Sequence, residues 1–563
     1  NPITLQKDFL LERAMKRVAL GLLALSVSSA LMAATPKFDG ARISADVKEL
    51  ASDAYEGRSP ATAGEEKTIA FLSKQFADAG LQPGGDLKDG KRLWTQAVPL
   101  RKGDIVGAPQ LALHQGGKTL PLEQGKQIAV RAAMNGASNV DISKAPLVFL
   151  GYGVKAPERN WDDFKGVDLK GKIAVVLIND PDFETGQGDF DGKGMTYYGR
   201  WTYKYEEGAR QGALGVLIVH ETAPASYGWA TVAGSNTNTM FDVVRDNPAD
   251  SHPLLEGWIQ RDLAVELFRS AGQDFEALKK KAQQRDFTPV PLTGASLDAK
   301  YAVKTEVITS HNVAARLEGS RHPDETIVYS AHWDHIGVGE PDARGDRIFN
   351  GALDNASGTA SLIELARGFA KAKRPERSVL FLAVTAEEKG LLGSEYYATH
   401  PLYPLEKTVA VINMDGMAPF GPSRDFGIYG AARFELLDQL KDVAKGWDIR
   451  YTPDPKPEAG LFFRSDHFPF AKRGVPALSW SAGQDWVDGG VAAGKKASED
   501  YTAKRYHQQG DEWQPDWVFA GAARDLEVLY TLGNQLANTR SWPNWSKDES
   551  FRAVRDASAD QRK

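Results

Sequence analysis

The chain has 563 residues, more than one ordinary domain accommodates, so at least two modules are expected. Its formal net charge of −6 is mild for this length and gives no reason to expect nucleic acid or an anionic membrane as a partner. It contains no cysteine, which excludes disulfides, thiolate nucleophiles and cysteine metal sites.

The N-terminal segment has the features of a secretory signal peptide. Met15-Lys16-Arg17 precede a short apolar run over residues 18–25, and small residues continue to Ala34. The run is too short for a comfortable membrane span, although a short anchor helix is an alternative. We expect residues 1–34 to comprise an extension and a signal peptide. The mature protein is then expected to be periplasmic or secreted and to have no membrane partner.

The next segment, residues 35–136, is assigned to the first part of the main domain. Residues 41–84 have a helical pattern that breaks at residues 56–60. Within them, residues 64–80 place their apolar side chains on roughly one helix face, and Gly80 is a good helix end.

Residues 137–291 read as a separate module. Buried strand-like runs occupy residues 147–150, 173–178 and 214–219, with a helical stretch at residues 203–212. This pattern predicts an inserted, compact, β-rich module with one or two helices.

From about residue 307 the pattern alternates between strand and helix, which predicts an α/β domain with a largely parallel sheet. The predicted strands cover residues 326–331, 378–384, 408–414 and 475–480, and the predicted helices include residues 356–371 and 433–445. We assign residues 292–540 to the main part of this domain. Residues 541–563 form a polar tail that is expected to be poorly ordered.

Three of these predicted strands run into side chains that can bind metal. The residues are His332 and Asp334 after the first strand, Glu387 and Glu388 after the second, and Asp415 after the third. A further carboxylate, Asp354, precedes the helix that follows the first strand. Ligands bind beyond the carboxyl ends of strands in an open α/β sheet, so these side chains are expected to converge.

These residue types suit a pair of zinc ions. A catalytic zinc needs about three protein ligands and one open position. One imidazole and three carboxylates are present, and His507, in a downstream loop, is free to supply a second imidazole. Three carboxylates leave two zinc ions with a net positive charge, which favours a bound hydroxide at neutral pH.

Two further roles follow from adjacency. With Glu388 on the metal, Glu387 is free to act as general base. Asp334 lies two residues after His332 and can accept its second ring N–H, which fixes the tautomer. Taken singly, Asp354 is more readily interpreted as a helix cap, and the Glu pair as the first-turn carboxylates of a helix. Their joint placement at strand ends favours a site.

As a set, these motifs resemble those of the di-zinc exopeptidases, which include aminopeptidase Y, bacterial leucyl aminopeptidases and glutamate carboxypeptidase II. The motifs are residues 330–335 (SAHWDH), 351–358 (GALDNASG), 386–394 (AEEKGLLGS), 413–415 (NMD) and 506–507 (YH). The likeness extends from about residue 41 to about residue 538. It implies a zinc-exopeptidase-like three-layer α/β/α domain with a mostly parallel sheet. It also implies that residues 137–291 are an inserted protease-associated domain, which in relatives covers the active site and limits substrate size.

The resemblance also implies a role for each site residue. His332 and Asp415 would bind one zinc ion, Glu388 and His507 the other, and Asp354 would bridge the two. Glu387 would be the base, Asp334 would orient His332, and the Tyr506 hydroxyl would help to stabilise the tetrahedral intermediate. His467 competes with His507 for the last ligand position. We favour His507, because a Tyr-His pair precedes the last helical region in relatives.

The implied activity is that of a zinc exopeptidase acting on peptides, and most naturally an aminopeptidase releasing N-terminal residues. A carboxypeptidase of the glutamate carboxypeptidase type is the first alternative, with Arg58, Arg464 and Arg473 as candidate cations for a substrate carboxylate. A different class is a non-hydrolytic binding protein or a glutaminyl-cyclase-like acyltransferase on the same fold. The complete ligand set disfavours that class. The sequence does not determine side-chain preference or oligomeric state.

Overall fold

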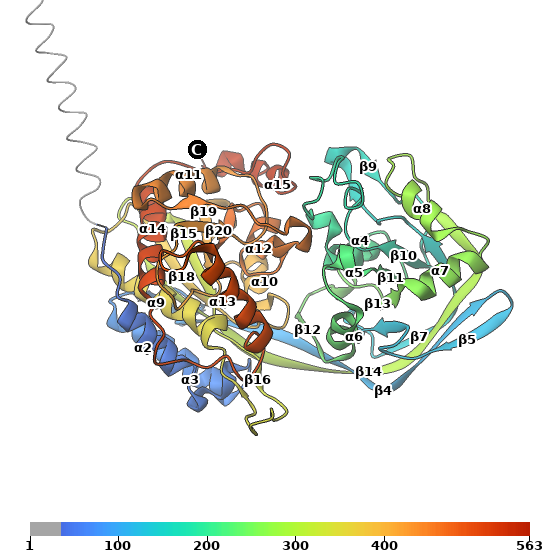
Figure 1. The fold of residues 1–563 in the computed structure, drawn as a ribbon, viewed down its shortest axis with the longest axis horizontal. Helices are drawn as coiled ribbons and strands as arrows, with labels where there is room; N and C mark the ends of the chain where they lie inside the picture. Colours follow the sequence, from blue (N-terminus) through green and yellow to red (C-terminus); the bar gives the residue numbers. More distant parts are fainter. Residues whose placement is uncertain (1–34, 563) are drawn as a thin grey trace, which may run out of the picture.

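The computed structural model describes residues 35–562, which form two lobes. The predicted signal peptide lies outside the described residues. Two long strands, β4 (Thr95–Gln115) and β14 (Val290–Leu317), pair antiparallel and run from one lobe into the other (Figure 1). None of the helices between residues 35 and 562 is both long and apolar enough to cross a membrane.

The first lobe is built on a mixed, mostly parallel sheet with the strand order β21-β20-β22-β19-β15-β18-β14. Its parallel centre consists of β15 (His322–His332), β18 (Arg377–Val384), β19 (Thr408–Met414) and β22 (Ala477–Ala482). Towards the edges, β14 and β20 (Asp425–Ile428) run antiparallel to their neighbours, and β21 (Arg450–Tyr451) ends the sheet. Every residue of β18 and β19 is buried, as expected for parallel strands covered on both faces.

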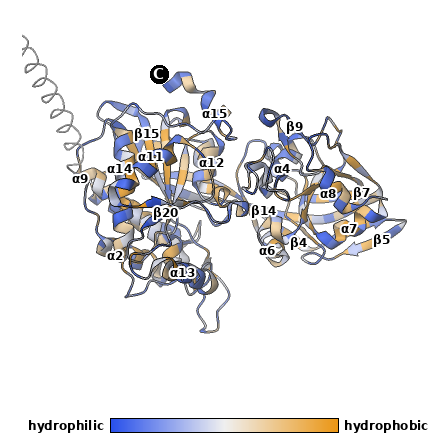
Figure 2. Cartoon of the chain, turned by 45° about the horizontal axis from the view of Figure 1, so that its top comes forward, coloured by the Kyte–Doolittle hydropathy of each residue, from blue (hydrophilic) through white to orange (hydrophobic). Residues whose placement is uncertain are grey.

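Neighbouring residues of β15 show that helices cover both faces of this sheet. The Tyr329 hydroxyl donates to the main-chain oxygen of Leu529 in α14 (2.7 Å), and its ring packs against Phe369 of α9. Ser330 points to the other face and donates to Asn413, the side chain of which reaches the loop before α12. The predicted three-layer α/β/α architecture is therefore confirmed, and apolar residues concentrate on the strands between the layers (Figure 2).

The helical pattern predicted for residues 41–84 is present as α2 (Gly40–Leu50) and α3 (Ala63–Asp78), and the helices predicted at residues 356–371 and 433–445 are present as α9 (Ser357–Lys371) and α11 (Glu435–Ala444). The other helices of this lobe are α10 (Leu392–Thr399), α12 (His467–Lys472), α13 (Gly490–Lys504), α14 (Ala520–Ala537) and α15 (Arg552–Asp556). The predicted break at residues 56–60 is present as a short 3-10 turn, Asp53–Arg58, between α2 and α3.

The second lobe also contains a parallel sheet, and it is more helical than predicted. Its sheet joins β7 (Asn139–Phe149), β10 (Ile173–Leu177), β11 (Gly215–His220) and β13 (Leu255–Gln260) in parallel, with β6 (Ile128–Val130) antiparallel at the edge. Its helices are α4 (Trp201–Arg210), α5 (Thr222–Ala225), α6 (Trp229–Thr237), α7 (Arg261–Ser270) and α8 (Phe275–Lys281). The expectation of one or two helices was wrong, because several of these helices are short and have weak apolar periodicity.

The core of the second lobe extends beyond the predicted range of 137–291. It includes Leu111 and Leu113 of β4, Ile128 of β6 and Val303 of β14. The boundary differs because β4 and β14 are continuous strands that belong to both lobes, so no change of composition marks the crossing.

The C-terminal residues 541–562 pack against the first lobe, so the expected poorly ordered tail is a wrong prediction. Trp545 is buried and donates its ring N–H to the main-chain oxygen of Gly474 (2.9 Å). Phe551 is buried beside it, and Arg555 donates to main-chain oxygens of β19. The prediction failed because it rested on the polar average composition of the segment, although two aromatic side chains and one guanidinium group in it are buried.

Candidate active site

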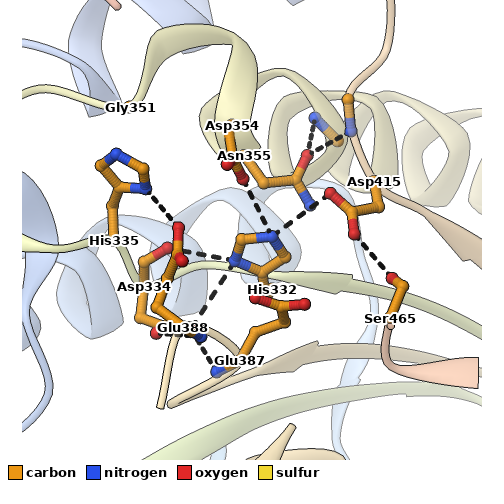
Figure 3. A network of polar contacts seen from close by, with 12 residues as sticks. His332, Asp334, His335, Gly351, Asp354, Asn355, Glu387, Glu388, Asp415 and Ser465 are labelled. Atoms are coloured by element: carbon orange, nitrogen blue, oxygen red, sulfur yellow. Dashed lines mark hydrogen bonds and ion pairs between the residues drawn. The ribbon is translucent and has the colours of Figure 1, made fainter. Parts of the chain in front are cut away.

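The carboxyl edge of the first sheet gathers the predicted site residues (Figure 3). His332 is the last residue of β15, Glu387 and Glu388 lie in the turn after β18, and Asp415 follows β19. Asp354 lies in a distorted helical turn, Ala352–Ala356, directly before α9.

Asp354 is the centre of this cluster. One carboxylate oxygen lies 3.3 Å from His332 Nε2 and the other lies 3.1 Å from His507 Nε2. His332 Nε2 is also 3.4 Å from Asp415 Oδ1, and His507 Nε2 is 3.1 Å from Glu388 Oε2. The five predicted ligands therefore form two groups that share one carboxylate. Their roles as zinc ligands stay predictions.

His335 joins the cluster as well, although the sequence analysis assigned it no role. It is fully buried, and its Nδ1 lies 2.7 Å from Glu388 Oε1. Within residues 35–562, two sets of three side chains hold their possible ligand atoms within 4.8 Å of one another: His332, Asp354 and Asp415, and His335, Asp354 and Glu388. His335 lies three residues after His332 in the same loop, and this position was the sequence feature that could have predicted its place in the cluster.

The alternative ligand His467 lies apart from the carboxylates. It is fully buried, and neither ring nitrogen has a hydrogen-bond partner in the described part of the chain. Burial lowers its pKa to about 3, and its ring packs edge-on against Phe462. The structure thus brings His507, and not His467, to the carboxylates.

The charges of the cluster balance only through its histidines. Burial and the Asp354 carboxylate act to raise the pKa of Glu388, but His335 and His507 lower it to about 2. Burial acts to lower the pKa of His507, but Asp354 and Glu388 raise it to about 10. No Lys or Arg among residues 35–562 forms an ion pair with Asp354, Glu388 or Asp415.

This donor set fits zinc. Imidazole nitrogens and carboxylate oxygens are ordinary zinc ligands, at about 2.0–2.2 Å from the ion. Ligand atoms 3.1–3.4 Å apart have the spacing of neighbouring corners of such a tetrahedral site. Buried carboxylates without a compensating lysine or arginine also favour a divalent cation.

Glu387 differs from its neighbour. It makes no ion pair with the cluster histidines among the described residues, and it lines the cleft between the lobes. Burial raises the pKa of Glu387 well above its ordinary value, and the Asp415 and Glu388 carboxylates add to the effect of burial against an opposing effect of His332. A carboxyl group of this kind is suited to accept and return a proton.

Asp334 contacts His332, but not through the atoms that were predicted. His332 Nδ1 lies 3.1 Å from the main-chain oxygen of Asp334, whereas the Asp334 carboxylate is 3.7 Å away. That carboxylate accepts hydrogen bonds from the main-chain N–H groups of Glu387 (3.1 Å) and Glu388 (3.4 Å). Asp334 therefore links the His332 loop to the Glu387-Glu388 turn.

Two residues that support the cluster were missed or misread. The Asp511 carboxylate accepts from the main-chain N–H groups of Leu353 (3.1 Å) and Asp354 (3.0 Å), which holds the turn that carries Asp354. The Arg58 guanidinium is buried and donates to main-chain oxygens on three separate segments, at Leu50, Trp333, Asn350 and Gly351. Arg58 is therefore not available to bind a substrate carboxylate.

Tyr506 lies at the rim of the site. It is 46% exposed, and its ring stacks on His507 with ring centroids 3.9 Å apart. The second candidate cation, Arg473, is paired with Glu395 (2.7 Å), whereas Arg464 lines the cleft between the lobes.

Comparisons with known proteins match parts of the chain to peptidases. Residues 312–530 match peptidase family M28. Mouse aminopeptidase NAALADL1 is 31% identical over 200 residues, which cover 31% of this chain and 24% of that protein. A probable zinc metalloprotease from Pyrenophora teres f. teres is 39% identical over 103 residues, covering 18% of this chain and 22% of that protein. Among solved structures, an aminopeptidase from Aneurinibacillus sp. strain AM-1 is 18% identical with a TM-score of 0.49, covering 90% of this chain and 95% of that one.

The predicted resemblance to the di-zinc exopeptidases is thereby confirmed for the part of the chain that carries the site. The matched stretches span about a quarter of the length of the two relatives named here.

Proposed function

We propose that this chain, in which residues 312–530 match peptidase family M28, is a zinc-dependent aminopeptidase that removes residues from the N-terminus of peptides. The observation that carries the proposal is the group of five ligand side chains that share Asp354 at the carboxyl edge of the sheet. The names of the matched relatives, an aminopeptidase and a zinc metalloprotease, support the same activity.

Two zinc ions are proposed. His332 and Asp415 would hold the first, Glu388 and His507 the second, and Asp354 would be shared by both. When bound, such ions polarise a substrate carbonyl and lower the pKa of water. His335 would lie behind Glu388 and fix the orientation of its carboxylate.

The proton transfers are assigned to Glu387. Its carboxylate would take a proton from the attacking water and pass it to the departing amine, as a general base and then a general acid. The raised pKa of Glu387 suits the second half of this role, because a proton on this group is stabilised. The Tyr506 hydroxyl, at the rim, would donate to the oxyanion of the tetrahedral intermediate.

The second lobe is proposed to limit the substrate. Arg200 and Trp201 at the start of α4, and Phe241 of β12 (Met240–Val243), line the same cleft as Glu387. A wall opposite the catalytic edge favours chain ends over internal segments of folded proteins. We infer that this lobe is the protease-associated domain expected from the resemblance. Periplasmic or secreted action is also proposed, on the support of the basic start and apolar run of residues 15–25.

The test uses the purified protein with aminoacyl-anilides and with N-blocked dipeptides, with and without a chelator. Cleavage of the anilides, abolished by the chelator and restored by zinc, is expected together with two zinc equivalents per chain. Cleavage of the blocked dipeptides alone would replace the proposal with a carboxypeptidase. Full activity in chelator with no bound metal would reject zinc chemistry.

A further inference from the structure

The cleft between the lobes has an uneven charge distribution that the proposed chemistry does not use. Two hollows of about 460 and 590 Å³ share lining residues from both lobes. Both contain Arg200 and Trp201 from the second lobe, and Glu388, Lys389 and Arg464 from the first. The cleft therefore begins at the metal-binding carboxylates and continues along cationic side chains.

Apart from Glu387 and Glu388 of the proposed active site, the acidic side chains that line this cleft are paired with cations. Glu206 is paired with Lys472 (2.6 Å), Asp242 with Arg245 (2.7 Å) and Glu395 with Arg473 (2.7 Å). A fourth cation of the wall, Arg131, is paired with Glu256 (3.0 Å). Because these charges are compensated within the protein, the paired side chains are not available to bind a charged ligand.

Arg200 and Arg464 are exceptions. Both line the two hollows, and neither forms an ion pair with a carboxylate within residues 35–562. Burial, reinforced by Arg464, lowers the pKa of Arg200 to about 10, so the Arg200 guanidinium group stays charged at neutral pH. The side chain of Arg200 lies near the ring of Trp201, with its guanidinium carbon 5.6 Å from the centroid.

Two guanidinium groups that line the same hollows without a carboxylate partner favour the binding of an anion there. A carboxylate is the natural partner, because a guanidinium group offers paired donors that match its two oxygens. Lys389 lines the same hollows and has its Nζ 5.6 Å from the ring centroid of Phe241, where it adds a third positive charge.

We propose that Arg200 and Arg464 form a subsite for a carboxylate on the part of the peptide that follows the cleaved bond. This inference rests on the proposed aminopeptidase function. The free ammonium group of the substrate is repelled by these cations, so they face the opposite end of the peptide. In a di- or tripeptide that end is the terminal carboxylate, and the preferred substrates are therefore short peptides with a free C-terminus.

The terminal carboxylate and an acidic side chain have the same chemistry, so the substrates must separate them. The set comprises a dipeptide, a tripeptide and a hexapeptide, each as the free acid and as the C-terminal amide, an amidated dipeptide with Asp in second position, and an aminoacyl-anilide. We expect kcat/KM to favour the free acid over the amide by about tenfold for the short peptides, the effect of one charge-assisted contact. The preference should disappear for the hexapeptide. A high rate for the amidated Asp dipeptide would assign the subsite to a side-chain carboxylate.

The variants Arg200→Gln and Arg464→Gln should each bring the acid-to-amide ratio close to one. Their kcat/KM on the anilide, which has no carboxylate, should stay within about twofold of the wild type. Arg200→Lys keeps the charge and should retain part of the preference. The matched control is Arg269→Gln, which removes an exposed arginine of α7 that is paired only within its own helix. Thermal unfolding of each variant checks that the fold is intact.

Equal rates on acids and amides by the wild type would overturn the subsite and leave the aminopeptidase assignment standing. Equal losses on acids, amides and anilide in Arg200→Gln and Arg464→Gln would also overturn it, because the arginines would then be structural. If the zinc-loaded protein cleaved none of these substrates, both the subsite and the proposed function would fall.

Discussion

Each lobe contains a histidine held between two carboxylates, and the two clusters differ in their charge environments. In the first lobe, His332 Nε2 lies 3.3 Å from Asp354 and 3.4 Å from Asp415. In the second, the two ring nitrogens of His252 lie 2.7 Å from Glu256 and 3.0 Å from Asp242.

The two clusters differ in whether arginines compensate the charge of their carboxylates. Asp242 also binds Arg245, and Glu256 also binds Arg131, so the charges around His252 are compensated within the protein. Around His332 the carboxylates outnumber the cations. Among the described residues, imidazoles are the only basic groups that form ion pairs with Asp354, Glu388 and Asp415.

A histidine between carboxylates is therefore not in itself a metal site. The first cluster can bind cations because its negative charge exceeds what the protein supplies, and because its ligand atoms converge from three strand ends. The second cluster connects β12 to β13 and stabilises the lobe. This contrast makes separate predictions for the same kind of substitution in each cluster.

The largest effect is expected from the shared carboxylate. Asp354→Asn should lose zinc and reduce kcat/KM by at least about 10³-fold, because metal-ion stabilisation is worth several kcal/mol. Asp242→Asn removes a carboxylate from the compensated cluster and should leave zinc content unchanged. Metal analysis and steady-state kinetics on both variants make the comparison. Equal zinc content in both variants would contradict the assignment of Asp354.

A second test separates the adjacent carboxylates. Glu387→Gln should keep zinc and lower kcat by about 10²–10⁴-fold, the usual effect of losing a general base. KM should change much less, because the lost interaction matters mainly in the transition state. Glu388→Gln should lose metal as well as rate. Near-normal turnover in Glu387→Gln would show that another group is the base.

The histidines provide a smaller contrast. His507→Ala should lower both zinc affinity and activity. Loss of a group that only supports a metal ligand typically costs about 10–100-fold, and the effect of losing a ligand should be at least as large. His467→Ala should leave zinc content nearly unchanged, because its ring contacts Phe462 and no carboxylate. His335→Ala is expected to fall between the two, because His335 contacts one ligand, Glu388. Zinc titration of the three variants ranks them, and loss of zinc from His467→Ala alone would reverse the assignment.

The ligand residues of the first cluster could be predicted from the sequence because they lie next to regular strands and helices. His332, Asp415 and the Glu387-Glu388 pair directly follow or end buried apolar strands, so a local pattern combined with the geometry of parallel sheets brings them together. Asp354 precedes a helix with a clear apolar face, which also is a local feature. The predicted convergence therefore needed no knowledge of long-range contacts.

The groups that escaped prediction depend on distant backbone. Asp511 binds main-chain N–H groups about 157 residues earlier in the chain, and Arg58 binds main-chain oxygens up to 293 residues later. Main-chain partners leave no trace in residue type, so neither role has a signature in the sequence. The compensating Arg131 of the His252 cluster is hidden for a related reason, because it follows β6 and pairs with Glu256, 125 residues later in the chain.

The smallest effect on turnover is expected from His252, whose contribution to stability depends on pH. Burial acts to lower its pKa, but Glu256 and Asp242 raise it from 6.5 to about 9. A group with a raised pKa in the folded state stabilises that state fully below about pH 6.5 and loses this contribution as the pH rises through about 9. Unfolding of the wild type should therefore become easier across this window, by about 1–3 kcal/mol.

His252→Gln cannot gain or lose the proton, so its stability should vary less with pH than that of the wild type between pH 6.5 and 9. Thermal unfolding of both proteins at a series of pH values measures the difference. The His332 cluster is the same in both proteins, so its titration cancels in the comparison. His400→Gln, which changes an exposed histidine outside both clusters, should keep the wild-type slope. If His252→Gln showed the same slope as the wild type, the compensated cluster would not hold a proton in this range, and the difference between the clusters would lie in geometry rather than in charge.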